Sequence, residues 1–359
     1  MRMIFHLPLP LNPKATSASG IRPVRMLAAF RELGLDVTVV AGHSSERREA
    51  IKAVLKDLRS GGRYDFVYSE SSTMPTAMTD PHHLPLHPLM DFRLLRAVRR
   101  SGGKVGLFYR DIYWMFPEYA TMVPFAQRTA AVANYRWDLH QYRSALDVMY
   151  LPSLPMASYV GDVPYSFKAL PPAHSIDQPD EVPSSPLRLF YVGGLGVHYK
   201  LHALVAAMRE VPEAHLTLCT REKEWQSEGP SYQPLPPNVE VVHKVGDAEL
   251  APFYATSNLG VLSTRPEGYF AFAVPYKLYE YIGHGLPILA TRNTMTGDTV
   301  AKNGFGWTLD HDPAVIASHL RSLVDHPEQL QSARESVVAA RDANTWAHRA
   351  AQVVADLTT

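Results

Sequence analysis

The stretch "AVPYKLYEYIGHGLPILA" (residues 273–290) places a short helical pattern directly before a short apolar run. Pro275 fits the first helical position and Gly285 suits the position just past a helix C-terminus, so the pattern predicts a helix over residues 276–284. The run "LPILA" after the glycine is typical of a buried strand. A helix that leads straight into a buried strand is part of a β–α–β unit, which indicates a parallel sheet.

The same alternation continues on both sides of this stretch. In the first half, the strand-like runs are "RMIFHLPL", "LDVTVVAG", "YDFVYSES" and "GKVGLFYRD", and the helix-like runs between them include "VRMLAAFRELG" and "MDFRLLRAVRRSGG". In the second half, the strand-like runs are "LRLFYVGG", "AHLTLCT", "VEVVHKV" and "LGVLST". We therefore predict the α/β class, with two doubly wound, Rossmann-like domains in series.

Length and local composition place the domain boundaries. A chain of 359 residues exceeds what one hydrophobic core usually supports. We predict a first domain over residues 1–169 and a second over 187–340, because residues 170–186 ("LPPAHSIDQPDEVPSSP") are rich in Pro and Ser and have no periodicity, as in a linker. Residues 341–359 have one apolar helical face, and we expect this helix to pack back on the first domain.

Composition excludes several classes of protein. Lys plus Arg and Asp plus Glu are both 35, so no overall positive field recruits nucleic acid. The single cysteine, Cys219, excludes an internal disulfide framework and indicates a reducing compartment. No run approaches 18 apolar residues, and the start "MRMIFHLPLPLNP" is interpreted as a first strand and not as a signal peptide. We expect a cytoplasmic protein.

A glycine turn follows the first strand of the second domain. Open parallel sheets bind ligands at the carboxyl ends of their strands. Gly193 and Gly194 lie there, where bare backbone amides could face a phosphate. The spacing differs from the G-x-G-x-x-G of dinucleotide binders and no acidic residue follows at the usual offset, which disfavours a nicotinamide enzyme. A glycine turn without a function is an equally good interpretation.

Lys277 and Glu280 stand three residues apart on the helix of the opening stretch, so they share one face. One interpretation is a surface ion pair worth a few tenths of a kcal/mol. The other divides their roles: Lys277 and the amides near Pro275 meet a diphosphate, while Glu280 accepts hydrogen bonds from a ribose diol.

Several segments, in order and spacing, resemble one enzyme family. "PYKLYEYIGHGLPILAT" is similar to the signature of family 4 type glycosyltransferases of the GT-B fold, particularly their bacterial exopolysaccharide and cell-surface polysaccharide branch. The other similar segments are "SASGIRPVRMLAAFRELGLDVTVVAG", "FYRDIYWMFPEY", "YVGGLGVHYKL" and "VVHKVGDAELAPFYATSNLGVL". The resemblance covers most of the chain.

The resemblance implies two domains that face a cleft, with a nucleotide-diphosphate sugar, in the UDP form, on the C-domain and the acceptor on the N-domain. It implies that Glu280 binds ribose and that Lys277, with the amides around Val274, lies near the diphosphate. Gly193 and Gly194 would leave room for the same phosphates. The donor is a substrate, so no cofactor is expected, and GT-B enzymes generally act without a metal.

Two further positions follow from the resemblance. Arg221, after the strand "HLTLCT", stands where a basic residue commonly neutralises the leaving diphosphate, although a solvated surface charge is about as good an interpretation. His243 ends "VEVVH", near the expected base pocket, where a half-buried histidine with its hydrogen bonds satisfied is the favoured alternative.

One departure from the family pattern affects the chemistry. The usual signature has a second glutamate eight residues before the ribose-binding one, and that position is Phe272; the nearest upstream acid, Glu267, is out of register. The donor sugar and the retaining or inverting course therefore stay open. An inverting enzyme needs a carboxylate base, and Asp111, at a strand end expected in the cleft, is the candidate. The alternatives for Asp111 are a helix N-cap or an ion pair with Arg110.

Two other patterns are better explained by a role in the fold than by a role in binding. "DHD" at 310–312 imitates a D-x-D metal motif, but Pro313 and a helical pattern follow, which favours helix capping and no metal. The helix "DFRLLRAVRR" (91–100) is interpreted as a crossover helix on its sheet. Its arginines also suit a peripheral contact with the inner face of a membrane, where a lipid-linked acceptor would lie.

The leading hypothesis is a hexosyltransferase of polysaccharide biosynthesis, acting on a saccharide or lipid-linked saccharide acceptor. Two alternatives stay open: a non-catalytic, nucleotide-sugar-binding partner subunit of another transferase, and a GT-B type nucleotide-sugar epimerase.

Overall fold

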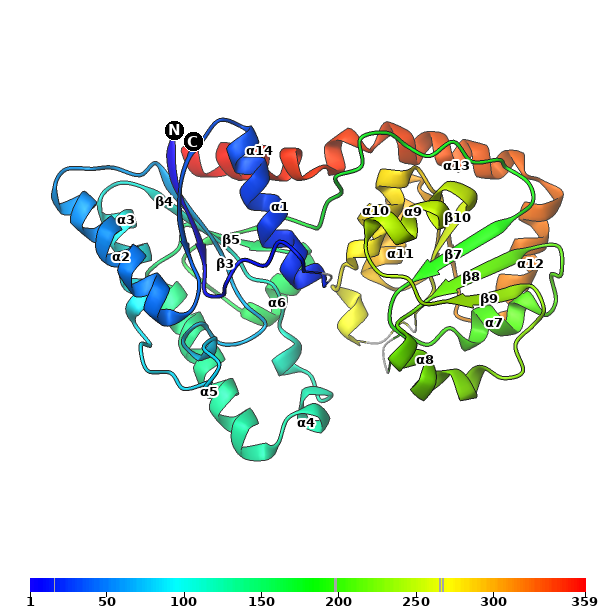
Figure 1. The fold of residues 1–359 in the computed structure, drawn as a ribbon, viewed down its shortest axis with the longest axis horizontal. Helices are drawn as coiled ribbons and strands as arrows, with labels where there is room; N and C mark the ends of the chain where they lie inside the picture. Colours follow the sequence, from blue (N-terminus) through cyan, green and yellow to red (C-terminus); the bar gives the residue numbers. More distant parts are fainter. Residues whose placement is uncertain (16, 197–198, 265, 267) are drawn as a thin grey trace. The chain divides into compact units, whose positions relative to one another are not determined.

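The computed structural model describes residues 1–15, 17–196, 199–264, 266 and 268–359. The chain forms two compact units, the first made of residues 1–171 and 346–359 and the second of residues 172–345. Each unit contains one six-stranded sheet in which every strand pair is parallel (Figure 1). The predicted α/β class with two doubly wound sheets is therefore confirmed.

The sheet of the first unit has the strand order β2-β1-β3-β4-β5-β6. The strands are β1 (Arg2–Leu7), β2 (Asp36–Ala41), β3 (Phe66–Glu70), β4 (Lys104–Phe108), β5 (Val148–Leu151) and β6 (Ser166–Ala169). The chain adds β2 on one side of β1 and β3 on the other, so the strand order reverses between β1 and β3. Ligands of open α/β sheets bind outside the carboxyl ends of strands at such a switch point.

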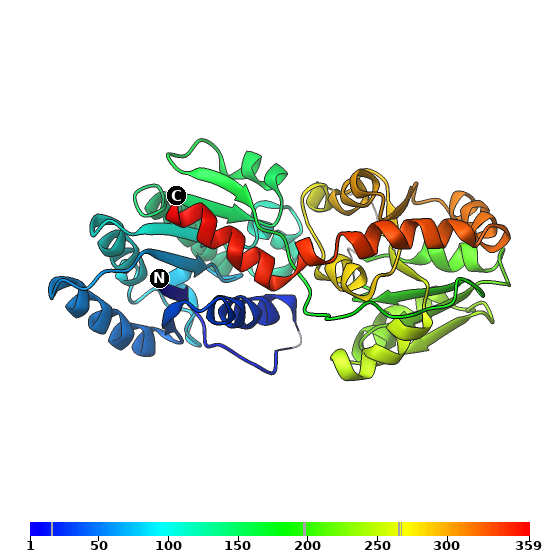
Figure 2. The same ribbon diagram turned by 90° about the horizontal axis from the view of Figure 1, so that it is seen from above.

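The helices of the first unit include the C-terminal one. They are α1 (Ala18–Glu32), α2 (Ser44–Arg59), α3 (Met90–Arg100), α4 (Tyr119–Met122), α5 (Phe125–Tyr142), α6 (Ala157–Val160) and α14 (Trp346–Thr358), with short 3-10 helices η1 (Thr76–Met78), η2 (Tyr113–Met115) and η3 (Leu154–Met156). Helix α14 packs against α1 and β4, and Figure 2 shows it lying across the first unit. Gly106 of β4 allows this approach, because a Cβ atom there would lie 2.9 Å from Leu357.

The sheet of the second unit has the order β12-β11-β10-β7-β8-β9, which reverses between β7 and β10. Its strands are β7 (Arg188–Val192), β8 (His215–Cys219), β9 (Val239–Val242), β10 (Leu259–Leu262), β11 (Ile288–Thr291) and β12 (Gly306–Leu309). Its helices are α7 (His202–Met208), α8 (Glu222–Glu228), α9 (Asp247–Thr256), α10 (Tyr276–His284), α11 (Met295–Asn303), α12 (Pro313–Asp325) and α13 (Glu328–Ala339), with η4 (Gly229–Tyr232), η5 (Gly268–Ala271) and η6 (Asp342–Asn344).

Helix α10 spans the predicted residues 276–284. Gly285 follows it with φ +73°, the left-handed conformation that favours glycine at a helix end. The sequence predicts Pro275 at the first helical position. In the structure it is the N-cap residue, one position earlier. Either position suits proline, because its missing N–H would have no helical partner there.

Tyr281 joins α10 to the second sheet where the strand order reverses, between β7 and β10. Its hydroxyl donates a hydrogen bond to the Phe190 carbonyl (3.0 Å) and accepts one from the Val192 amide (3.3 Å). Its ring lies over Gly260 of β10, where a Cβ atom would come within 2.7 Å of the ring. The N-terminus of α10 is thereby held beside the ends of β7 and β10.

The segment that the sequence presents as a linker lies with the second unit from Pro172 onward. His174 is buried, and its Nε2 donates to the Arg341 carbonyl (3.1 Å). The Arg341 guanidinium in turn donates to the carbonyls of Ile176 (2.8 Å) and Gly283 (2.7 Å). The segment is therefore a strap on α10 and not a free spacer. The Ile176 carbonyl of this segment accepts a hydrogen bond from Arg341, which is far away in the chain. No local pattern in the sequence could have predicted this contact.

Among the residues described, none of the helices has the length and apolarity needed to cross a bilayer.

Candidate functional site

Glu280 on α10 is the centre of the candidate site in the second unit. Lys277 forms an ion pair with its Oε2 atom, and the Tyr254 hydroxyl donates to the same oxygen at 3.0 Å. Within the described part of the chain, no residue hydrogen bonds to Oε1. The prediction that Lys277 and Glu280 share a face is correct. The ion pair alone fits a surface ion pair as well as a ligand-binding role. Oε1 of Glu280, however, remains available to accept a hydrogen bond, because no described residue uses it.

Tyr254 is a buried residue of α9 that the sequence analysis did not single out. Burial holds the pKa of the Tyr254 phenol well above its usual value, and the negative charge of Glu280 is the second cause. The phenol therefore stays protonated and donates a hydrogen bond to Glu280. Its ring stacks on His284 with centroids 3.8 Å apart. His284 is fixed in turn by Asp180 of the strap, whose Oδ2 lies 2.6 Å from Nδ1. This chain of contacts sets the orientation of the Glu280 carboxylate.

The predicted glycine turn holds a carboxylate of the protein itself. The Leu195 amide donates to Glu224 Oε2 (3.0 Å), and a Cβ atom on Gly194 would lie 3.0 Å from that oxygen. The Gly193 amide donates to the Cys219 carbonyl (3.1 Å). A phosphate at this turn would have to replace Glu224, so the glycines leave room for a ligand only when that side chain moves.

Arg221 belongs to the same cluster. It is the residue before α8, its side chain is 64% exposed, and its guanidinium lies 3.6 Å from Glu224 Oε1. The structure thus brings Gly194 and Arg221 together through Glu224, a residue that sequence reasoning missed. An exposed arginine held by one carboxylate can turn to another anion at small cost, because such surface pairs are weak.

His243 has one ring nitrogen hydrogen-bonded, as in the interpretation that the sequence favours, but it is exposed and not half-buried. Its Nδ1–H donates to the Thr220 carbonyl at 2.9 Å, at the end of β8, which leaves Nε2 as an acceptor. The Thr220 hydroxyl beside it is buried and has no hydrogen-bond partner among the described residues. Both groups lie at the carboxyl edge of the sheet.

The residues before α10 are apolar. Val274 is partly buried and packs against the buried cluster that contains Phe190 and Leu278. Phe272, at the position of the usual glutamate, is 2% exposed and its ring contacts that of Tyr269. Glu267, the nearest upstream acid, lies outside the described residues. A buried aromatic ring therefore occupies the position that is a glutamate in the family pattern.

In the first unit, Asp111 follows β4 and is half-buried. Its Oδ1 accepts a hydrogen bond from the amide of Tyr113 (2.8 Å), the first residue of η2. The N-cap position itself is Ile112, so Asp111 caps this turn from one residue earlier than an N-cap would. Arg110 donates to Glu70 Oε2 (2.9 Å) and to the Ser71 carbonyl (3.2 Å). Asp111 is thus held at the carboxyl edge of the sheet with a defined orientation, and a catalytic role for it stays a prediction.

Glu70 anchors this edge, and the sequence analysis did not detect it. It is fully buried at the end of β3 and lies 3.3 Å from the Arg22 Nε atom as well as beside Arg110. Burial lowers the pKa of Arg110, against the opposing effect of Glu70. Arg22 also lies 3.5 Å above the ring of Phe108. Buried charges need partners, so these side chains form one interdependent cluster.

The arginine-rich helix α3 packs its apolar face on the sheet, as predicted; Phe92, Leu94, Leu95 and Val98 are buried. Arg96 donates to Gln141 and to Ser144 Oγ (3.0 Å), and Arg99 lies 3.1 Å from Asp147. Two of the arginines therefore join α3 to the end of α5 and the turn after it.

The "DHD" motif is a helix cap, as predicted. Asp312 Oδ1 accepts hydrogen bonds from the amides of Ala314 (2.9 Å) and Val315 (3.0 Å) at the start of α12. Over the described ranges, no group of three or more histidine, cysteine or acidic side chains is placed to hold a metal ion.

Comparison with known families gives one match, and it lies in the second unit. Residues 186–326 match the family model described as "Glycosyl transferases group 1". The matched range runs from the strand β7 through α10 to the end of α12 and includes the β7/β10 switch point. A search of curated proteins finds no significant sequence match.

Solved structures share the fold over nearly the whole chain. Anabaena HepE in complex with UDP is 12% identical, with a TM-score of 0.67 and 100% of each chain covered. Sucrose-phosphate synthase from Thermosynechococcus elongatus is 16% identical, with a TM-score of 0.63 and coverage of 98% of this chain and 97% of the other. WaaG, described as a glycosyltransferase of lipopolysaccharide biosynthesis, is 14% identical, with a TM-score of 0.60 and full coverage of both chains. At these identities the likeness establishes the fold alone.

Proposed function

We propose that this protein is a metal-independent hexosyltransferase of the GT-B, family 4 type. It would move a sugar from a UDP-linked donor to a saccharide or lipid-linked saccharide acceptor in bacterial polysaccharide biosynthesis, in the cytoplasm at the inner face of the membrane. The observation that carries the proposal is the Glu280 carboxylate, oriented by Tyr254 and Lys277 with one oxygen unused, inside the segment that matches the glycosyltransferase model.

The chemistry of the second unit supports a nucleoside diphosphate as ligand. A carboxylate oxygen accepts hydrogen bonds from the two hydroxyls of a ribose. Lys277 stands in the first turn of α10, where the helix dipole and unpaired amides favour an anion such as a diphosphate. The structures of Anabaena HepE contain UDP or UDP-glucose, which supports the choice of uridine.

One observation favours a second candidate, a nucleotide-sugar-binding partner subunit without its own catalysis. Phe272 places a buried ring where the family pattern has a glutamate next to the transferred sugar. The two candidates differ in turnover: a transferase releases UDP only when an acceptor is present, whereas the partner subunit binds the donor and releases nothing. Turnover of the donor without any acceptor would indicate the epimerase alternative.

UDP and UDP-sugars are expected to raise the melting temperature of the protein. A ligand at 100 times its dissociation constant stabilises the folded state by about 2.7 kcal/mol, because it binds the native chain alone. The measurement is a thermal-shift series with UDP, GDP, ADP, CDP and inorganic phosphate, without added metal. Equal shifts with all four nucleotides, or no shift with any, would count against a uridine site in the second unit.

Tyr254→Phe is expected to weaken UDP binding roughly tenfold, because a hydrogen bond to a charged group is worth about 1.5 kcal/mol and Glu280 would lose part of its orientation. Isothermal titration measures the affinity. The matched control is Tyr232→Phe, which removes a hydroxyl that accepts a hydrogen bond from the Leu201 amide elsewhere in the same unit. Similar losses of affinity in both variants would show that Tyr254 acts only through the stability of the fold.

A further inference from the structure

The glycine turn after β7 is fixed by two hydrogen bonds. The Gly193 amide donates to the Cys219 carbonyl (3.1 Å), and the buried Tyr191 hydroxyl donates to the Gly194 carbonyl (2.5 Å). The next two amides of the turn are those of Gly194 and Leu195. No described residue accepts a hydrogen bond from the Gly194 amide, and the Leu195 amide donates to a side chain of α8. Successive backbone amides in a turn can form an anion-binding concavity.

Glu224 of α8 occupies this turn as an anion that belongs to the protein. Its Oε2 atom lies 3.0 Å from the Leu195 nitrogen, and a Cβ atom on Gly194 would lie 3.0 Å from the same oxygen. Its other oxygen, Oε1, lies 3.6 Å from the Arg221 guanidinium. Carboxylate and phosphate oxygens accept the same charge-assisted hydrogen bonds from amides and guanidinium groups. The carboxylate therefore shows that the turn and Arg221 together accommodate an oxygen anion.

The contacts that hold Glu224 are of a kind that a ligand can replace. The Glu224 side chain is 32% exposed, and that of Arg221 is 64% exposed. Ion pairs at such exposure contribute little to stability, because water screens the charges and both side chains lose freedom on pairing. A rotation of the Glu224 side chain into water is therefore a low-cost way to free the turn, which its own two hydrogen bonds keep in place.

We propose that Glu224 is a specificity-determining residue: it occupies the turn in the free protein and is displaced by the diphosphate of the nucleotide. This inference rests on the proposed function. On displacement, the Leu195 amide and Arg221 pass from the carboxylate to phosphate oxygens. Every ligand that places a phosphate at the turn meets the same cost of displacement. A nucleoside diphosphate offsets this cost through its ribose contact with Glu280, whereas inorganic pyrophosphate has no such anchor. Glu224 thus keeps small anions out of the donor site.

The test compares the affinities of UDP and uridine for the full chain by isothermal titration. Glu224→Gln is expected to bind UDP about three- to tenfold more tightly, because a neutral amide oxygen competes less well than a carboxylate for the Leu195 amide and Arg221. Uridine has no phosphate, so its affinity should not change. The matched control is Glu222→Gln, which removes the same charge from the same helix turn. Glu222 is exposed and has no hydrogen bond or ion pair with another described residue, so this variant should leave the UDP affinity unchanged.

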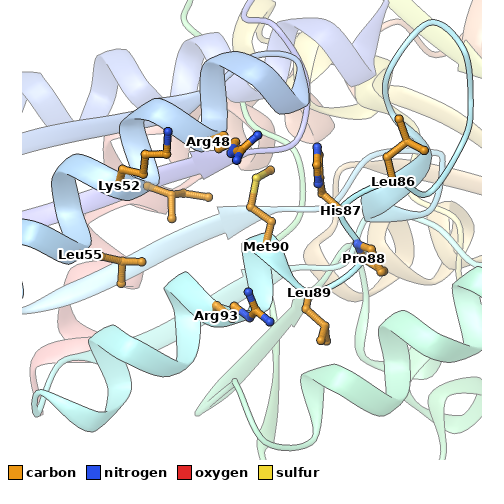
Figure 3. A pocket seen from close by; sticks show the side chains of 10 residues that line it. Arg48, Lys52, Leu55, Leu86, His87, Pro88, Leu89, Met90 and Arg93 are labelled. Carbon is orange, nitrogen blue, oxygen red and sulfur yellow. The ribbon is translucent and has the colours of Figure 1, made fainter.

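A second place where a phosphate could bind is tested separately. The pocket of about 420 Å³ between α2 and α3 of the first unit is lined by Arg48, Lys52 and Arg93, and no described acidic residue lines it (Figure 3). An anion that enters this pocket displaces no carboxylate. Pyrophosphate is therefore expected to bind more tightly to Glu224→Gln than to the unmodified protein, also when Arg48→Gln and Arg93→Gln are present in both.

Matching melting temperatures of the free proteins show that the variants are folded. An equal gain of UDP affinity in Glu222→Gln, an equal gain for uridine, or a pyrophosphate affinity that does not rise would each overturn the inference. A loss of UDP affinity in Glu224→Gln would overturn it too, because Glu224 would then contact the ligand and not give way to it. UDP binding that is the same in Glu224→Gln and in the unmodified protein would overturn this inference and leave the proposed function standing. If neither protein binds UDP, the proposed function fails as well.

Discussion

Glu280→Ala is expected to weaken UDP binding by roughly 10- to 100-fold. A charge-assisted hydrogen bond is worth about 1.5 to 3 kcal/mol, and the variant removes the carboxylate that would hold the ribose diol. It also leaves the Lys277 ammonium and the buried Tyr254 hydroxyl without their common partner. Isothermal titration with UDP measures the change, and UDP-sugar turnover should fall with it.

The control for Glu280 is a glutamate of the same unit that forms only a surface pair. Glu210, 66% exposed, lies 3.3 Å from Arg321, and Glu210→Ala should leave UDP affinity unchanged. If Glu280 is only a structural partner of Lys277 and Tyr254, its removal should lower the stability of the fold and leave the UDP affinity unchanged. That result would remove the observation on which the proposed function depends.

The helix and strand pattern could be predicted from sequence because its signals are local. The α10 helix begins after Pro275 and ends at Gly285 because of the backbone preferences of these two residues, and the strand β11 follows directly. Helix periodicity likewise identifies the buried face of α3. The shared face of Lys277 and Glu280 follows from helix geometry alone.

The partners of these residues could not be predicted, because they come from distant parts of the chain. Tyr254, which donates a hydrogen bond to Glu280, is 26 residues before it in the chain. Glu224, which accepts a hydrogen bond from the Leu195 amide, is 29 residues after Leu195. Arg110 reaches Glu70 across 40 residues. The contacts of Glu224 and Glu70 exist because parallel strands bring their carboxyl ends to one edge, where the residues that end or follow them meet. The contact between Tyr254 and Glu280 exists because helices α9 and α10 pack against each other. A single sequence shows which residues lie near the edge but not which of them pair.

Asp111→Asn is expected to reduce sugar transfer by about 10² to 10⁴-fold, the range lost with a general base, while UDP affinity stays within about twofold. Asp111 belongs to the first unit, whereas the residues proposed to bind the nucleotide belong to the second. A loss confined to turnover therefore separates a role in chemistry or acceptor placement from a role in donor binding. The assay is release of UDP with and without acceptor, alongside titration of UDP.

The hydrogen bond from the Tyr113 amide to Asp111 Oδ1 makes this substitution a sharp one, since an asparagine amide oxygen can accept the same bond. Asp111→Asn keeps the cap and removes only the charge and the basicity, whereas Asp111→Ala removes the cap as well. If the residue is merely a cap, the asparagine variant should retain its activity and its melting temperature, and only the alanine variant should lose stability, by about 1 kcal/mol. An asparagine variant that is stable, binds UDP and fails to transfer the sugar would assign the carboxylate to the reaction, and an active one would favour a retaining course, which needs no enzyme base at this position.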